Sequence, residues 1–538
     1  MRNFLLAAAV AAAAASPAAA QPATPPKLIV AISVDQLSSD LFEAYRPHLT
    51  GGLKRLADGG VTFVNGYQSH AATETCPGHS TLLTGRHPAA TGIIANNWTD
   101  QGAARADKSI YCAEDERVAG STSSTYTVSP EHLRVSTLGD RLKAADPRSR
   151  NVAVAGKDRA AVMMGGRALD QRWYWDGKAW ASDVRQAAEL PGIAQFKASW
   201  AARFAQAVEP LDPPALCQAR ATPFQITPAM TIGNGRFGRA AGDNRGFRAS
   251  PELDDVTLTL AALVTAQMKL GKGPATDVLS IGLSATDYVG HSYGWGGQEM
   301  CLQLLSLDQS LGRFLGWLDT QAVDYAVVLS ADHGGQDAVE RLRAAGNLKA
   351  VRADPGLAAG EMGKLLAPQV GRPAPVLFGD GVGGDVWLDR AISAADRPKV
   401  LAAAVARYKA HPQVETVFTA AELSATPLPS GDPRGWSLIS RVRAAFDPSR
   451  SGDFYVVLKE HVSTVAKPGP GYAASHGTPW DYDRRVPVIF MAKGLKPATP
   501  ATSADTVDIL PTLASWVGLP LAPGSVDGSC RTEAAHCR

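Results

Sequence analysis

Three short apolar runs, each followed closely by an aspartate, constrain the fold of this chain more than any other sequence feature. The runs cover residues 27–34, 277–283 and 325–330, and the aspartates are Asp35, Asp287 and Asp332. A continuous apolar run of this length is typical of a strand that is buried on both faces, as in a parallel sheet. Side chains that follow such strands meet at one edge of the sheet, where open α/β sheets bind their ligands.

The remaining periodic segments alternate between strand and helix patterns. Further strands are predicted at residues 61–64, 151–155 and 485–491, and a hairpin at 172–182. Helical spacing predicts helices in the segments 41–58, 134–145, 253–270, 298–318 and 506–517. This alternation predicts an α/β fold, with an open, mostly parallel sheet and helices on both of its faces.

The segment 336–470 interrupts this alternation, because Pro- and Gly-rich spans are mixed there with helical runs. We therefore predict a cap or accessory region that is inserted into a single catalytic domain. The catalytic domain would comprise residues 21–335 and 471–538.

The first twenty residues have the pattern of a secretory signal peptide. Arg2 supplies the positive start, residues 4–15 form the apolar core, and three alanines at 18–20 fit a cleavage site before Gln21. An uncleaved anchor is the alternative. No later segment is apolar enough to span a bilayer, so the mature protein is expected to be periplasmic or secreted, with no membrane span.

Charge and cysteine content agree with export. The formal net charge is only +2, and no dense basic run is present, so nucleic-acid binding is not expected. The six cysteines fit an oxidising compartment, and none forms a CxxC pair. Because Cys530 and Cys537 are close in a polar tail, we predict a local disulfide between them. The oligomeric state remains open from sequence.

The stretch 70–97 contains the candidate nucleophile, Thr75, in the run Thr75-Cys76-Pro77-Gly78-His79. A strand pattern precedes this run and a short helical pattern follows it, and Pro77 suits a first helical turn. Thr75 would then sit just ahead of a helix N-terminus, where free N–H groups and the helix dipole favour a phosphoryl group. The plainer interpretation is that Thr75 is only an N-cap.

Carboxylate and imidazole groups at four separate strand ends or loops predict metal binding. Asp287 and His291 have i,i+4 spacing, which places both on one face of a helix. Each residue alone has an ordinary explanation as a turn, cap or surface group. Together they supply enough ligands for two metal ions, and mixed imidazole and carboxylate ligation suits zinc. The predicted ligands are Asp35, Thr75, Asp287, His291, Asp332, His333 and His476.

Lys157, Arg159 and Asn96 are the predicted phosphate-binding residues. Lys157 and Arg159 follow a strand with i,i+2 spacing, so an extended backbone would send both side chains the same way. Arg binds phosphate oxygens with a planar fork, and Lys supplies a point charge. Two solvated surface charges are the alternative for this pair, and a turn role is equally ordinary for Asn96.

This set of residues resembles the bimetallic site of the alkaline phosphatase superfamily, and in detail that of the PafA/PhoK-type bacterial phosphate monoesterases. That group uses a threonine nucleophile, an asparagine twenty-one positions later and a Lys-x-Arg pair, which Thr75, Asn96 and Lys157-Asp158-Arg159 match. The resemblance covers nearly the whole mature chain. It implies that Asp287, His291 and His476 hold one zinc ion, and that Asp35, Asp332 and His333 hold the other together with Thr75.

The implied activity is that of an exported alkaline phosphatase with two zinc ions per chain. It would hydrolyse small phosphate monoesters through a phosphothreonine intermediate at Thr75 and release inorganic phosphate. Phosphodiester hydrolysis is the nearest alternative, because nucleotide pyrophosphatase/phosphodiesterases share the metal site and the threonine but lack the Lys-x-Arg pair. The sulfatase pattern C/S-x-P-x-R does not fit residues 76–79. A zinc-storage protein would explain the ligands, but not Thr75 or the Lys/Arg pair.

Overall fold

The computed structural model describes residues 24–185 and 187–537. The predicted signal peptide, residues 1–20, lies outside these described residues. Among the helices that are described, none combines the length and the apolar character needed to cross a membrane.

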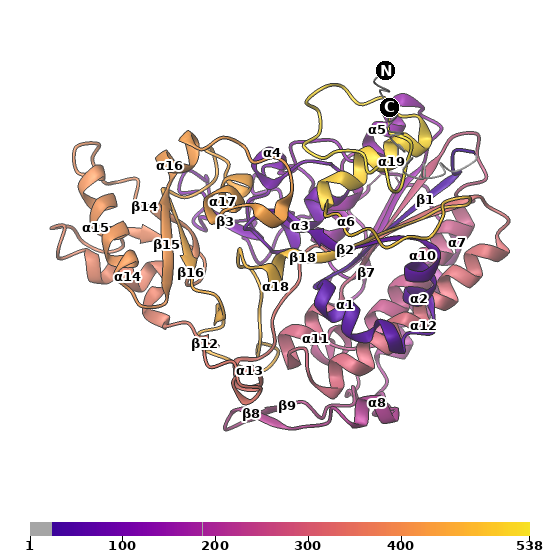
Figure 1. The fold of residues 1–538 in the computed structure, drawn as a ribbon, viewed down its shortest axis with the longest axis horizontal. Coiled ribbons are helices and arrows are strands. Elements are labelled where there is room, and N and C mark those ends of the chain that lie inside the picture. Colours follow the sequence, from indigo (N-terminus) through magenta and orange to yellow (C-terminus); the bar gives the residue numbers. More distant parts are fainter. Residues whose placement is uncertain (1–23, 186, 538) are drawn as a thin grey trace, which may run out of the picture.

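A nine-stranded mixed sheet forms the centre of the molecule, with strand order β19-β2-β18-β11-β1-β10-β5-β6-β7 (Figure 1). Five neighbouring strands, from β11 to β6, run parallel to one another. The strands are β1 (Leu28–Val34), β2 (Val61–Tyr67), β5 (Asn151–Ala155), β6 (Gln171–Trp175), β7 (Trp180–Ala181), β10 (Asp277–Leu283), β11 (Tyr325–Ser330), β18 (Arg485–Met491) and β19 (Ala504–Asp505).

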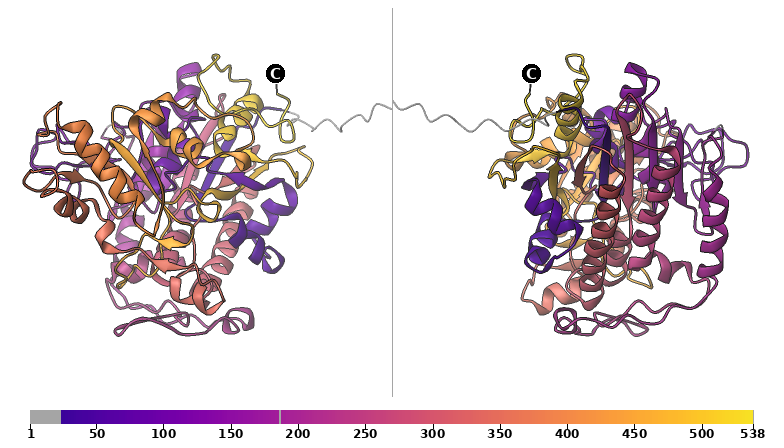
Figure 2. Two further views of the ribbon diagram at one scale, coloured as in Figure 1. Left: turned by 60° about the vertical axis from the view of Figure 1, so that its left-hand side comes forward. Right: turned by 90° about the vertical axis from the view of Figure 1, so that its right-hand side faces the viewer.

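Alternating side chains of β1 enter two different cores, which explains why this strand is apolar throughout. Val30 and Ile32 pack into a cluster with one helical layer, whereas Ile29 and Ala31 pack into a cluster with the other. The first layer contains α1 (Ser39–Tyr45), α2 (Gly52–Gly59), α7 (Pro191–Phe204), α10 (Pro251–Met268), α11 (Ala285–Tyr293) and α12 (Gln298–Thr320). The second contains α3 (Thr75–Leu82), α5 (Leu138–Ala145), α6 (Asp158–Gly165) and α19 (Ile509–Val517). The predicted sheet with helices on both faces is confirmed (Figures 1 and 2).

Strand β18 runs antiparallel to both of its neighbours, β11 and β2. Consequently β2 runs parallel to β11, and the segment that enters β18 lies at the same edge of the sheet as the segments that leave β1, β10 and β11. A loop before β18 and a helix after β2 can therefore reach the same site as the loops after the central strands.

The segment that interrupts the α/β pattern contains a second sheet, drawn in orange to one side of the main sheet in Figures 1 and 2. Its strand order is β13-β14-β16-β15, and it has its own apolar cluster, which includes Leu388, Val400 and Phe454. Its elements are β13 (Leu377–Phe378), β14 (Gly384–Leu388), β15 (Val414–Thr419), β16 (Phe454–Leu458), α14 (Ala359–Leu366), α15 (Arg397–Lys409), α16 (Ala420–Ala425) and α17 (Leu438–Ala445). Two short strands, β12 (Val351–Arg352) and β17 (Val462–Ser463), pair where the chain enters and leaves this insert.

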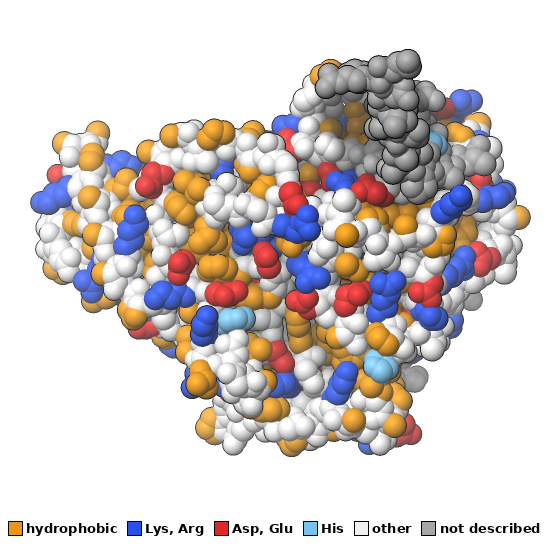
Figure 3. All heavy atoms as spheres, viewed as in Figure 1, with side chains coloured by type: hydrophobic (Ala, Val, Ile, Leu, Met, Phe, Trp, Pro, Cys, Tyr) orange, Lys and Arg blue, Asp and Glu red, His pale blue; other side chains and the backbone are white. Residues whose placement is uncertain are grey.

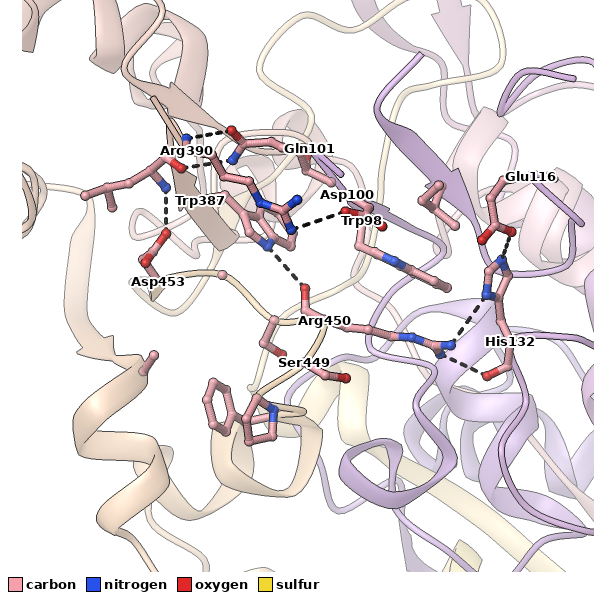
Figure 4. A pocket seen from close by; sticks show the side chains of 18 of the residues that line it. Trp98, Asp100, Gln101, Glu116, His132, Trp387, Arg390, Ser449, Arg450 and Asp453 are labelled. Atoms are coloured by element: carbon pink, nitrogen blue, oxygen red, sulfur yellow. Dashed lines mark hydrogen bonds and ion pairs between the residues drawn. The ribbon is translucent and has the colours of Figure 1, made fainter. Parts of the chain in front are cut away.

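A polar seam joins the insert to the rest of the chain around a cavity of about 450 Å³ (Figure 4). Arg390 donates its backbone N–H to the Gln101 side chain at 2.8 Å, and its guanidinium lies 3.3 Å from Asp100. On the other side, the Arg450 guanidinium donates to the His132 carbonyl at 2.9 Å. Two segments far apart in the sequence, around 98–101 and 387–390, are thereby held together.

Shorter elements complete the fold: α4 (Pro88–Thr91), β3 (Asn97–Thr99), β4 (Ser109–Tyr111), α8 (Ala215–Gln218), β8 (Phe224–Thr227), β9 (Met230–Ile232), α9 (Asn244–Arg248), α13 (Val339–Ala344) and α18 (Asp481–Arg484). The predicted helical segment 41–58 is instead two helices, α1 and α2, joined by a short 3-10 turn at Arg46–His48. Pro47 in that turn lacks the N–H that a continuous helix requires.

All six cysteines form disulfides: Cys76–Cys112, Cys217–Cys301 and Cys530–Cys537. The predicted local bridge in the C-terminal tail is therefore confirmed. The sequence offered no basis for choosing the other two pairs, which join residues that are distant along the chain.

A buried imidazole ties the C-terminal part of the chain to the region around the candidate nucleophile. His87 lies 3.2 Å from Asp505 and 3.3 Å from Asp527. Burial alone would lower the pKa of His87, but the two carboxylates outweigh burial and raise it to about 9. His87 is therefore charged in the folded protein at neutral pH.

We expect this imidazolium to make stability depend on pH. The ordinary pKa of His is 6.5, so its contribution is fully present below that value and is lost as pH rises through about 9. The loss in unfolding free energy should be on the order of 3 kcal/mol. Urea unfolding below pH 6.5 and above pH 9 should reveal this loss in wild type and much less of it in His87→Gln. Equal pH dependence in both proteins would contradict the assignment.

Candidate active site

Thr75 is the first residue of helix α3, and the residue as a whole is 1% exposed. Thr75 was predicted to lie just ahead of the helix, but the helix begins at Thr75 itself. The N-cap residue is therefore Glu74. Glu74 does not cap the helix with its side chain. Its carboxylate instead accepts the backbone N–H of Asn96 at 2.7 Å. The Thr75 hydroxyl is thus free of a capping role and lines a large cavity.

Asn96 and a disulfide hold the segment around Thr75 in place. The Asn96 side-chain oxygen accepts the backbone N–H of Cys76 at 2.8 Å, and Cys76 is bonded to Cys112. The N–H of Cys112 donates to the Asn96 carbonyl at 2.9 Å. Since the Asn96 oxygen is used in this way, its amide NH₂ group is the part of the side chain that remains for a ligand.

Gly78 allows helix α3 to approach the end of β11. A Cβ atom at this position would lie 1.9 Å from the backbone oxygen of Asp332, a contact that only backbone movement could relieve. The glycine in this motif is therefore required by packing between the nucleophile helix and a metal-ligand candidate.

Gly78→Ala should displace α3 and lower kcat/KM by about a hundredfold, because displacements near 1 Å in an active site have effects of that size. Gly316→Ala provides the matched control. Gly316 is also helical, in α12, and a Cβ there would meet no atom within 4 Å. The control should retain activity and be as stable as wild type or slightly more so. Equal activity of the two variants would show that the close approach is unimportant.

The predicted metal ligands form two adjacent groups. In the first, the Asp287 carboxylate lies 3.3 Å from His291 Nε2 and 3.4 Å from His476 Nε2. In the second, His333 Nε2 lies 3.5 Å from Asp35 and 3.4 Å from Asp332. The rings of His333 and His476 stack with centroids 3.6 Å apart, so the two groups share a border. All six side chains predicted from four separate parts of the chain are therefore close together.

Each of the three histidines has its Nδ1 atom hydrogen-bonded to a backbone carbonyl. The partners are Ala474 for His291, Gly334 for His333 and Thr73 for His476, at distances of 2.9, 2.8 and 2.7 Å. Such bonds place the proton on Nδ1 and leave the Nε2 lone pair directed into the site, as in histidines that bind metals.

Buried acceptor atoms in these groups lack hydrogen-bond partners within the described part of the chain. They are Asp35 Oδ1, Asp287 Oδ1, Asp332 Oδ2 and His333 Nε2. Burial lowers the pKa of His333 to about 3, so its imidazole is neutral. Because unpartnered buried acceptors are costly, this donor set fits two cations with mixed nitrogen and oxygen ligands.

Lys157 and Arg159 both reach Thr75, but not from an extended backbone as predicted. Lys157 is the N-cap of α6 and Arg159 lies in its first turn. Lys157 Nζ is 3.5 Å and Arg159 Nη2 is 3.4 Å from the Thr75 hydroxyl. Both cations therefore reach the Thr75 hydroxyl from the start of α6.

Lys157 compensates the charges of both ligand groups. Its ammonium lies 2.6 Å from Asp35 and 2.5 Å from Asp287. Burial would lower the pKa of Lys157, but these carboxylates outweigh burial and raise it, so the ammonium stays charged. The Arg159 guanidinium, in contrast, has no carboxylate within 4 Å among the described residues, and its Nε is buried without a partner.

The site opens into a cavity of about 710 Å³. Its walls include segments that the sequence did not point to, such as residues 380–385 and Tyr455 of the insert, and Arg245, Arg248 and Tyr472. Neither ligand group contacts the separate cavity at the seam in Figure 4. Thr75, Arg159 and the ligand candidates Asp287, His291 and His476 therefore line the 710 Å³ cavity.

The chain was compared with known proteins. Residues 29–479 match the family model described as type I phosphodiesterase / nucleotide pyrophosphatase. This chain belongs to that family. The family is part of the alkaline phosphatase superfamily, in agreement with the resemblance of the motifs.

Three alkaline phosphatases are similar to this chain over nearly the whole length of each protein. Alkaline phosphatase PhoK from Sphingomonas sp is 51% identical, covering 94% of this chain and 91% of PhoK. Alkaline phosphatase PhoD from Zymomonas mobilis is 45% identical, covering 96% and 90%. The crystal structure of alkaline phosphatase PafA superposes with a TM-score of 0.82 at 25% identity, covering 95% of this chain and 99% of that chain.

Two further residues of this family member were missed by the sequence analysis. His79 Nδ1 lies 3.0 Å from Asp332 and 2.9 Å from the carbonyl of Thr75, so it links the nucleophile helix to a ligand candidate. Glu74 is buried, which raises its pKa to about 7. Both flank Thr75 in the sequence, but neither has a spacing signal that separates it from an ordinary helix residue.

Proposed function

We propose that this protein is an exported alkaline phosphatase that hydrolyses phosphate monoesters at a two-zinc site, with Thr75 as the nucleophile. The observation that carries the proposal is the placement of the Thr75 hydroxyl within 3.5 Å of Lys157 and 3.4 Å of Arg159, beside both ligand groups. The names of the relatives PhoK, PhoD and PafA, all alkaline phosphatases, support the same activity.

The reaction would proceed in two displacements at phosphorus. The Thr75 oxygen forms a bond to phosphorus as the bond from phosphorus to the ester oxygen breaks, which releases the alcohol and leaves phosphothreonine. Water then attacks the same phosphorus, the bond to Thr75 breaks, and inorganic phosphate leaves. Lys157, Arg159 and the Asn96 amide would bind the non-bridging oxygens in both steps, since phosphoryl transfer depends mainly on positioning and charge compensation.

Two zinc ions would be held by Asp287, His291 and His476 and by Asp35, Asp332 and His333, the latter group together with Thr75. When bound, the ions would supply Lewis-acid charge for the displacement at phosphorus. The carbonyls of Ala474, Gly334 and Thr73 orient the three imidazoles for this role. Export is proposed from residues 1–20 and the three disulfides, which suit an oxidising compartment.

The Lys157/Arg159 pair is expected to set the preference for monoesters over diesters. A monoester presents two negative charges on its non-bridging oxygens, whereas a diester presents one and carries a second substituent. Hydrogen bonds to charged groups contribute roughly 1.5–3 kcal/mol each. Lys157→Ala/Arg159→Ala should therefore lower kcat/KM for para-nitrophenyl phosphate by about a hundredfold or more. Turnover of bis-para-nitrophenyl phosphate should fall much less.

Both substrates and the zinc content should be measured on the same preparations. The control is Lys54→Ala/Arg55→Ala, which removes two cations from helix α2, where they pair with Asp58 and Asp319. This variant should behave as wild type. A wild-type enzyme that favoured the diester would make phosphodiesterase the function. Equal losses on both substrates would show that the pair does not determine specificity.

A further inference from the structure

The cavity extends well beyond the groups that contact a phosphoryl group, and one of its walls carries two arginines with no carboxylate partner. These are Arg245 and Arg248, which line the cavity from the short helix α9. Within the described residues, neither guanidinium lies within 4 Å of a carboxylate, and Arg248 Nε is buried without a hydrogen-bond partner. The i,i+3 spacing places both on one face of α9.

Other arginines of the same region are paired away from the cavity. Arg239 and Arg203 both contact Glu252, at 2.7 and 3.2 Å, and Arg236 contacts Asp212 at 2.5 Å. Arg245 and Arg248 have no such carboxylate partner among the described residues, and both line the cavity. Arg248 is half-buried, and a half-buried guanidinium without a counter-ion is unfavourable, so its location indicates a binding role. Arg245 is exposed at the edge of the same cavity.

The neighbours of the two arginines place them along helix α11, which carries Asp287 and His291. The Arg248 guanidinium lies 4.8 Å from the centre of the Tyr288 ring, and Lys157 Nζ is also 4.8 Å from that ring. The Arg245 side chain passes Gly471, where a Cβ would lie 3.7 Å from its Cδ. The next residue, Tyr472, stacks on His291 with centroids 5.0 Å apart. The arginines therefore continue the cation-rich wall outward from Lys157 and Arg159.

Three acidic side chains also line the cavity: Glu74 and the insert residues Asp380 and Asp385. Neither Arg245 nor Arg248 contributes to the pKa shifts of these three acids, for which burial is the largest cause.

We propose that Arg245 and Arg248 bind an anionic group on the alcohol portion of the substrate. The preferred substrates would be phosphate monoesters whose leaving group carries a carboxylate or a second phosphate. This proposal rests on the proposed function: in-line displacement by Thr75 sends the leaving group away from Thr75 into the cavity. An anion held there by the α9 guanidinium groups gains charge-assisted hydrogen bonds that a neutral alcohol cannot form.

A matched substrate pair isolates this interaction. Phenyl phosphate and meta-carboxyphenyl phosphate have the same aromatic leaving group, and only the second carries an extra carboxylate. Wild type should show the higher kcat/KM for the carboxylated ester. In Arg245→Gln/Arg248→Gln the ratio of the two kcat/KM values should fall about tenfold. In wild type the ratio should also decline as ionic strength rises, because salt screens the charges.

Three single variants test whether the change in this ratio comes from the charge of Arg245. Arg245 is exposed, so Arg245→Gln and Arg245→Glu should fold, and the charge reversal should lower the ratio further than the neutral change. Arg236→Gln, which removes an ion-paired arginine outside the cavity, should leave the ratio unchanged. An unchanged ratio in the double variant, with phenyl phosphate still hydrolysed, would overturn the subsite alone. Failure of wild type to hydrolyse either ester would overturn the proposed function, and the subsite with it.

Discussion

Replacing Thr75 by alanine should abolish phosphatase activity while the fold and the metal content remain. Thr75 is the one hydroxyl group within 3.5 Å of both Lys157 and Arg159 among the described residues. Loss of a nucleophile that forms a covalent intermediate removes the main reaction path, so kcat should fall by at least about a thousandfold. Acid quenching during turnover of a phosphorus-labelled monoester should place the label on the peptide that contains Thr75.

Thr75→Ser is the matched control, because it retains the hydroxyl and removes only a methyl group. It should keep measurable turnover and a labelled peptide. The alanine variant should show neither, although its zinc content stays near that of wild type. Turnover near the wild-type rate in Thr75→Ala would exclude Thr75 as the nucleophile.

Removal of the metal ions should have an effect of similar size. Purified wild type is expected to contain two zinc ions per chain, and chelation should abolish activity until zinc is restored. His291→Ala and His333→Ala each remove one ligand from a different group, so each should lower zinc content and activity. Loss of a single metal ligand leaves the remaining buried carboxylates poorly compensated.

His411→Ala serves as the control for these variants. His411 pairs with Asp354 in the insert, far in sequence from every ligand candidate, and should leave two zinc ions bound. Full activity in a metal-free preparation would refute the two-zinc proposal. An unchanged zinc content in both ligand variants would show that other residues bind the metal.

The central strands could be predicted closely from the sequence because their apolar runs are continuous. The run 325–330 and the run 277–283 coincide with β11 and β10, since both faces of these strands are covered by helices. Asp287 and Asp332 follow these strands at the predicted edge of the sheet. Local sequence is sufficient here, because burial on both faces leaves a signal that does not depend on distant partners.

The direction of β18 could not be predicted in the same way. Its apolar sequence identifies a strand, but it would look the same in either direction. His476 precedes this strand, and in a parallel arrangement it would lie at the opposite edge from Asp35 and Asp332. Only antiparallel pairing with β11 brings it to the site, and this pairing depends on the whole sheet.

The geometry of cations around the cavity could not be predicted from the sequence. Lys157 and Arg159 were predicted to act together, but the argument from an extended backbone was wrong, because α6 begins at Asp158. Arg245 and Arg248 lie in a segment without clear periodicity, and only the cavity reveals that they face the site. The surface carries arginine and lysine side chains interspersed with acidic ones, as the face in Figure 3 shows, so cations near a site are not distinctive in sequence.

The pairing of β12 with β17 has an evolutionary consequence. Val351 and Val462 are register partners, so the chain leaves and rejoins the main body at neighbouring points. A change in the length of the intervening segment therefore leaves its two ends at the same place on the main body. Residues 380–385 of this segment line the cavity, so changes within it would alter the cavity wall and not the predicted metal ligands. New substrate ranges could arise by replacement of one module, with no need to rebuild the catalytic centre.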